Sequence, residues 1–192
     1  MSYAPTDRVT PHFRLRELDP EDALRLREGG HRVAEHLLQQ LEVIRAATGA
    51  RPMTITRRGG YQPPDDIATL DWPDERSDGS RHRGRAGEGA LVGDGEQLPF
   101  SLAADIVNRM PPLELANLIV DLAIAGEISI GGVGCYHYGP EPHSKRGFVH
   151  VDTRTSGHAR WAYPSSGPVV VYRPSGTRGS IHRRFRWRGH QR

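Results

Sequence analysis

The run Phe148-Val149-His150-Val151-Asp152 alternates apolar and polar side chains, which is typical of a β-strand with two different faces. Successive side chains of a strand point to opposite faces, so the Phe, His and Asp share one face and the two valines share the other. We expect the valines to face a core and His150 and Asp152 to face a cleft. Such a pair suits metal binding or acid–base chemistry, although a surface histidine beside a salt-bridging aspartate gives the same pattern.

Further elements are predicted on both sides of this strand. Apolar residues recur at three- and four-residue intervals over residues 31–48, which predicts a helix that ends at Gly49. A second helix is predicted from Pro111 or Pro112 to Ala125, because proline suits the first turn of a helix and Gly126 suits its exit. The weaker patterns predict an extended or irregular segment over 1–20, a short helix over 20–27, strands over 53–56, 128–130 and 169–172, and a glycine-rich stretch over 131–136.

The loose alternation of helices and strands indicates an α+β fold with a small, mostly antiparallel sheet and flanking helices. Residues 62–100 are polar and rich in Gly and Pro, so we expect a long loop or insertion there. The length of 192 residues suits one domain or one domain with a tail. We therefore predict a main domain over residues 1–165 and a basic C-terminal tail over 166–192.

Composition excludes several classes of protein. The chain is 36% hydrophobic and 26% charged, and no apolar run approaches the roughly 20 residues of a membrane helix. The N-terminal residues lack the apolar core of a secretory signal, so no export through such a signal is expected. The single cysteine, Cys135, excludes an intrachain disulfide framework and a cysteine-rich zinc site.

The charges are unevenly placed along the chain. Of 26 basic residues 25 are arginine, and no acidic residue follows Asp152. A basic end on an acidic body favours an anionic partner or docking on another subunit, while a solvated tail is the simpler interpretation. Arginines and aromatics mix over residues 181–188, which also suits nucleic-acid backbones. Nothing in the rest of the chain indicates base recognition, so we rank nucleic acid last.

Two other residues stand out as candidate metal ligands. His82 lies in the polar stretch, where a single histidine is more often an ordinary loop residue. Asp105 follows two alanines and precedes Ile106, so its side chain is not expected to be fully solvated. Its alternative role is to cap the N-terminus of a helix.

Taken together, these motifs resemble the zinc peptidases of the M15 type, which include D-alanyl-D-alanine carboxypeptidases, murein endopeptidases and phage endolysins. The resemblance covers about residues 12–161 and is most specific in its second half. It rests on Ser80-Arg81-His82, Ala103-Ala104-Asp105, Gly131-Gly132-Val133-Gly134-Cys135-Tyr136, Phe148-Val149-His150-Val151-Asp152-Thr153-Arg154, Ala159-Arg160-Trp161 and the opening His12-Phe13-Arg14-Leu15-Arg16-Glu17-Leu18.

The resemblance implies a zinc ion held by His82, Asp105 and His150, with a fourth position for water. It implies hydrolysis of the stem peptides of bacterial peptidoglycan. Asp152 is our candidate for the carboxylate that takes the proton of the water, because it shares a face with His150. It could instead orient that histidine. Without a signal, such a protein is expected in the host cytoplasm before lysis or on a phage virion, acting on the cell wall.

The chain also departs from the family pattern. His82 and Asp105 are separated by a long glycine-rich stretch, whereas the family spaces its first two ligands closely. The family's Gly-Tyr-Arg turn has Gln62 in the place of arginine, with Arg57 and Arg58 nearby. Gly147 stands where some relatives carry their base. These departures favour a second hypothesis, a catalytically lapsed module that serves as a tail, baseplate or neck component of a phage virion and contacts other subunits through its basic end.

Overall fold

The structure is a computed structural model that describes residues 8–18, 35–56, 59–60, 82, 91–92, 96–97, 103–154 and 158–188. The chain divides into two compact units, residues 1–38 with 55–104 and residues 39–54 with 105–192. The predicted helix over 20–27 and most of the polar stretch over 62–100 lie outside the described residues. No helix within the described ranges combines the length and the hydropathy that crossing a bilayer requires.

The described part of the first unit is small. It holds one helical turn, α1 (Leu15–Leu18), and a two-stranded antiparallel sheet of β2 (Leu91–Val92) and β3 (Glu96–Gln97). The backbone N–H of Arg14 donates to Glu17 Oε2 at 2.9 Å, which satisfies a donor at the start of α1. The prediction of an extended or irregular N-terminal segment is wrong at this helical turn.

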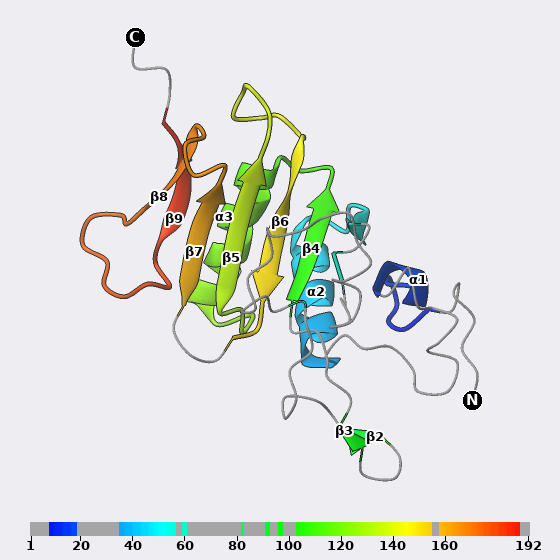
Figure 1. The fold of residues 1–192 in the computed structure, drawn as a ribbon. Helices are drawn as coiled ribbons and strands as arrows, with labels where there is room; N and C mark the ends of the chain where they lie inside the picture. Colours follow the sequence, from blue (N-terminus) through cyan, green and yellow to red (C-terminus); the bar gives the residue numbers. More distant parts are fainter. Residues whose placement is uncertain are drawn as a thin grey trace. The chain divides into compact units, whose positions relative to one another are not determined.

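The second unit is built on a five-stranded mixed sheet, so the predicted α+β class is confirmed (Figure 1). β5 pairs antiparallel with β6 and parallel with β7, and β4 lies on the other side of β6. The strand order is β1 (Met53–Ile55), β4 (Ala103–Asn108), β6 (Gly147–Asp152), β5 (Gly132–His137) and β7 (Ala159–Tyr163). The predicted strands around residues 53–56 and 148–152 are present.

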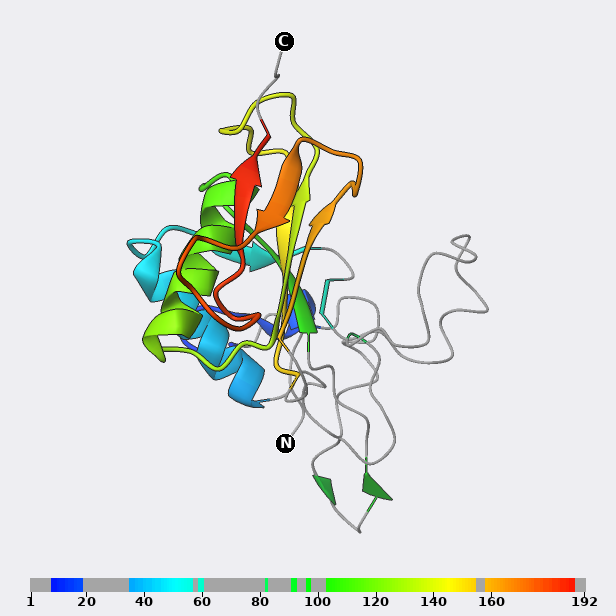
Figure 2. The same ribbon diagram turned by 90° about the vertical axis from the view of Figure 1, so that its left-hand side faces the viewer.

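One face of this sheet is the core. The alternating side chains on this face of β5 and β6 are inaccessible to solvent; they are Val133, Cys135, Val149 and Val151. Helix α3 (Pro112–Ala125) packs against these strands (Figure 2). It carries a proline in its first turn and ends at Gly126 in the left-handed conformation, with φ of 76°, as the sequence predicts. The longer helix predicted over 31–48 corresponds to α2 (Glu35–Ala47).

The glycine-rich stretch after residue 130 is a strand, whereas residues 128–130 are irregular, so the predicted boundary is wrong. The register explains why β5 needs glycine: Gly132 lies opposite Asp152, and Gly134 lies between His150 and Trp161. A Cβ on either glycine would overlap the side chain of Asp152 or of Trp161. The large neighbours, and not a turn, account for these glycines.

Asp105 lies within β4, so the alternative prediction that it caps a helix is wrong. Ala104 and Ile106 are fully buried, and the carboxylate points to the opposite face of the strand. That face also carries the polar side chains of β6.

The segment over 166–192 contains an antiparallel pair, β8 (Val169–Tyr172) and β9 (Arg184–Trp187), of which only the first strand was predicted. Asn117 of α3 holds β9 through two hydrogen bonds of 2.8 Å, to the backbone N–H and to the carbonyl of Phe185. Phe185 is 2% exposed, and Arg184 forms an ion pair with Asp121. These contacts dock the pair of strands on α3.

Candidate metal centre

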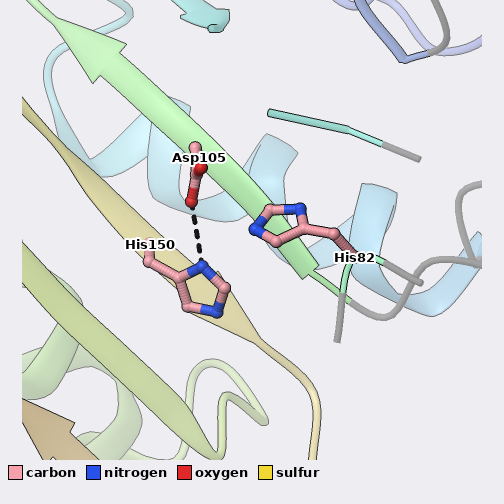
Figure 3. Close-up of side chains that lie close together, drawn as sticks. All are labelled: His82, Asp105 and His150. Carbon is pink, nitrogen blue, oxygen red and sulfur yellow. Dashed lines mark hydrogen bonds and ion pairs between the residues drawn. The ribbon is translucent and has the colours of Figure 1, made fainter. Parts of the chain in front are cut away.

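The centre is built first from two neighbouring strands. Asp105 on β4 and His150 on β6 point from the same face of the sheet, and His150 Nδ1 lies 2.9 Å from Asp105 Oδ1 (Figure 3). Their side chains are 15% and 9% exposed. Both candidate ligands are thus held by a regular sheet and largely screened from water, which strengthens electrostatic interactions between them.

A second carboxylate fixes the other end of the imidazole. Asp152 Oδ2 lies 3.3 Å from His150 Nε2, and the Asp152 side chain has no solvent exposure. Arg154 in turn holds Asp152: its backbone N–H and its Nε donate to Oδ1 at 3.1 and 2.7 Å, and its Nη2 donates to Oδ2. The sequence therefore builds a chain of contacts from Arg154 through Asp152 to the ring of His150.

The charges of this chain stabilise one another. Burial raises the pKa of Asp152, but the hydrogen bonds from Arg154 and His150 outweigh it and hold the pKa well below its usual range. Burial lowers the pKa of His150, but hydrogen bonds to Asp105 and Asp152 outweigh it, so the net pKa is raised. The two carboxylates on either side of the His150 ring therefore favour its protonated form when no metal ion is bound.

His82 completes a group of three possible ligands, as the sequence predicted. One ligand atom each from His82, Asp105 and His150 lies within 4.8 Å of the others, and both histidines are buried (Figure 3). Two ligands of one tetrahedral zinc ion lie roughly 3.4 Å apart, so binding would draw these ligand atoms closer together. These three side chains could together hold a metal ion.

The contacts of both imidazoles fit such a role. His82 Nδ1 lies 3.0 Å from the carbonyl oxygen of Gly60, which can only accept, so this nitrogen carries a hydrogen and Nε2 is the nitrogen that could bind a metal ion. His150 Nε2 faces the carboxylate of Asp152, and Nδ1 lies 2.9 Å from Asp105, so a metal ion at this place would take the position of a proton on Nδ1. Metal-binding histidines usually donate their remote N–H to a carbonyl or a carboxylate. Two imidazole nitrogens and one carboxylate oxygen are a donor set that zinc accepts.

Trp161 of β7 borders the centre. Its ring centroid lies 5.0 Å from that of His150, and its Nε1 donates to Tyr136 Oη at 3.2 Å. The Arg154 guanidinium lies 5.7 Å from the centre of the indole. The absent side chain at Gly134 leaves the space in which the indole lies beside His150.

Not every predicted site residue can be placed. Arg57, Arg58 and Gln62 lie outside the described residues. Gly147 begins β6 with φ of 133°, and a Cβ there would overlap the carbonyl of Tyr136, so the backbone of the strand accounts for this glycine. Arg154 and Trp161 were quoted in the family motifs without a role; the Asp-x-Arg spacing after the strand was the available signal.

Comparison of the chain with models of known families, with curated proteins and with solved structures finds no match. The geometry therefore carries the functional argument: a mixed α+β fold with a buried group of two histidines and one aspartate that could bind a metal ion.

Proposed function

We propose that this protein is a zinc-dependent hydrolase whose metal ligands are His82, Asp105 and His150. The observation that carries the proposal is the fixed orientation of both imidazoles. Each presents one nitrogen to the group of ligands and offers its other nitrogen to an acceptor, the Gly60 carbonyl or the Asp152 carboxylate. A surface histidine that only pairs with an aspartate would not require this arrangement.

The chain's own residues define what the centre can do. A zinc ion held there would supply Lewis acidity to a water molecule and to a substrate carbonyl. His82, Asp105 and His150 would provide three ligands. Because His150 and Asp105 are largely screened from solvent, electrostatic interactions between these side chains and a bound charge would be stronger than in water.

We assign Asp152 to positioning His150 in preference to accepting a proton from water. Its oxygens face Arg154 and the remote nitrogen of the imidazole, and its side chain has no exposed surface. The pKa of Asp152 is held below its usual range, which makes the carboxylate a weak base. The alternative role, proton acceptance, predicts normal zinc affinity with lost turnover when Asp152 is changed.

The substrate class that we propose is the stem peptide of bacterial peptidoglycan, cut at a peptide bond. The support is the resemblance to M15-type peptidases in the motifs that lie on β5, β6 and β7. All three strands contribute to the face that carries His150. The strength of this resemblance in residues 131–161 is the reason to choose a peptide bond over other hydrolysable bonds.

Zinc titration tests the proposal most simply. The full chain, stripped of metal, should bind about one zinc ion per molecule, and the His150→Ala variant should lose this ion and all release of amino groups from purified peptidoglycan. His143→Ala is the matched control, because His143 is 79% exposed and pairs only with Glu114 among its described contacts. A folded wild-type protein that binds no zinc would sink the proposal.

A second candidate function is favoured by the docked C-terminal strands. Five exposed arginines lie along this segment: Arg173, Arg178, Arg183, Arg186 and Arg188. We propose as the alternative a lapsed peptidase module that contacts acidic surfaces of virion subunits through these arginines. Replacing all five by glutamine should then abolish incorporation into particles and leave the fold intact. A monodisperse monomer that binds no particle component would remove this alternative.

A further inference from the structure

Five aromatic rings form a continuous cluster on the face of the sheet that carries His150. Tyr136 lies opposite Phe148 and beside Tyr163 in the register of β5, β6 and β7. Tyr136 stacks on Phe148 with centroids 4.3 Å apart, and Tyr163 lies 5.2 Å from Tyr136. Tyr138, just beyond β5, reaches both Phe148 and Tyr163 at 6.3 and 6.2 Å. With Trp161 these rings form what we call the aromatic platform.

The aromatic platform is continuous with the candidate metal centre. Phe148 and His150 are two residues apart on β6, so their side chains project from the same face of the strand. Trp161 joins the two regions, because its ring lies 5.0 Å from that of His150 and its N–H donates to Tyr136. Aromatic rings therefore adjoin His150 on this face of the sheet.

Two tyrosines open the aromatic platform to solvent. Tyr138 is 45% exposed and Tyr163 is 46% exposed, and they account for two of the three large apolar side chains that are exposed in the described residues. Their ring planes meet at 80° with centroids 6.2 Å apart, so the two rings contact each other edge to face. Burial raises the pKa of Tyr138, as do Tyr163, Tyr136 and Asp105, so its hydroxyl keeps a proton to donate.

The chemistry of peptidoglycan decides which part of the substrate suits these rings. Stem peptides consist of alanine and of acidic or diamino residues, whose side chains are small or charged and gain little from aromatic surface. Sugar rings combine an apolar C–H face with a rim of hydroxyls, and the rings of tyrosine are likewise apolar with one polar end. Exposed aromatic patches next to a polar centre commonly mark ligand-binding surfaces.

We propose that the aromatic platform is a saccharide subsite, which stacks an N-acetylhexosamine ring of the glycan against Tyr138 and Tyr163. This inference rests on the proposed function, because it takes peptidoglycan as the substrate. The subsite holds the glycan while the attached stem peptide extends toward His150 and Asp105.

The test uses the full chain without metal and a tetramer of N-acetylglucosamine as the probe, with binding followed by calorimetry and by tryptophan fluorescence. We expect Tyr138→Ala and Tyr163→Ala each to weaken binding by about three- to tenfold, and Tyr138→Phe to retain most of it. Tyr172→Ala is the matched control, because Tyr172 lies on β8 and packs against Arg186 outside the aromatic platform. Circular dichroism verifies that each variant is folded.

The outcomes separate this inference from the proposed function. Saccharide binding that depends on Tyr138 and Tyr163 in a protein that binds no zinc would support the subsite and overturn the hydrolase. Zinc binding and stem-peptide cleavage with no saccharide binding would overturn the subsite alone. A loss of affinity for the isolated stem peptide in Tyr138→Ala, with the tetramer unaffected, would also overturn it.

Discussion

The two faces of the central sheet differ in what the same strands contribute. On β6, Val149 and Val151 are fully buried against the core, while His150 and Asp152 project from the other face into a network of charges. Because successive side chains of a strand point to opposite faces, one residue packs in the core and the next contributes to the candidate metal centre. The comparison teaches that substitutions one position apart should separate zinc affinity from folding stability.

The largest separation is expected at Asp152. Asp152→Asn removes the charge that orients His150 and leaves Arg154 without its carboxylate, so zinc affinity should fall by about 10- to 100-fold. Competition with a chromogenic chelator measures this change. Asp121→Asn is the matched control, since it breaks the exposed ion pair with Arg184 and should leave zinc affinity unchanged. Unchanged affinity in Asp152→Asn with lost peptidoglycan cleavage would instead favour proton acceptance.

The opposite pattern is expected on the core face. Val151→Ala removes two buried methyl groups beneath α3 and should lower the free energy of unfolding by about 2 kcal/mol. Zinc affinity should remain within about twofold of wild type, because the backbone of β6 is held by both neighbouring strands. Urea denaturation and zinc titration of the same preparation give both numbers. A large loss of zinc affinity would show that the two faces are not independent.

Gly134 on β5 tests the same difference between the two faces of the sheet, because it lies opposite His150. Gly134→Ala places a methyl group against Trp161, and the indole must move away from His150. We expect a loss of about 1–3 kcal/mol in stability together with a shift of tryptophan emission. Gly126→Ala is the control. Its added Cβ would contact no atom, so any loss of stability comes from the left-handed backbone at this residue and tryptophan emission should not shift. A Gly134→Ala protein with unchanged emission would contradict the packing described here.

The smallest effect is expected from Cys135 on the core face. Burial raises the pKa of its thiol to about 12. Above its ordinary value of 9.0 the unfolded thiol ionises while the native thiol stays protonated, so stability falls as pH rises beyond that value. Cys135→Ala should make this alkaline loss shallower in urea denaturation. Alkylation of the native thiol at pH 8 as fast as in urea would refute its burial.

The parts of the fold that could be predicted are those that depend on residues close together in the sequence. The alternation of residues 148–152 and the proline and glycine at the ends of α3 specify these elements without reference to distant residues. The start of strand β5 was predicted wrongly. Its glycines make room for the side chains of Asp152 and Trp161 on neighbouring strands, which no local sequence pattern reveals. Asp105 allowed two roles; its position within β4 excludes the helix cap, and the neighbouring strand β6 brings it beside His150.

The candidate centre shows the same limit. His150 and Asp152 could be paired from their spacing, and the resemblance to a known family supplied His82 and Asp105. The contact of Gly60 with His82 and that of Arg154 with Asp152 could not be predicted, because both depend on the folded backbone. The role of Trp161 likewise became visible only from the parallel register of β5 and β7.

X-ray absorption spectroscopy of the zinc-loaded protein tests the convergence of His82, Asp105 and His150 most directly. The spectrum should show two imidazole nitrogens and at least one oxygen at about 2.0–2.2 Å from zinc, with no sulfur. The His82→Ala variant should lose one imidazole shell and the His143→Ala variant none. A wild-type spectrum with a single imidazole, unchanged in His82→Ala, would contradict the account.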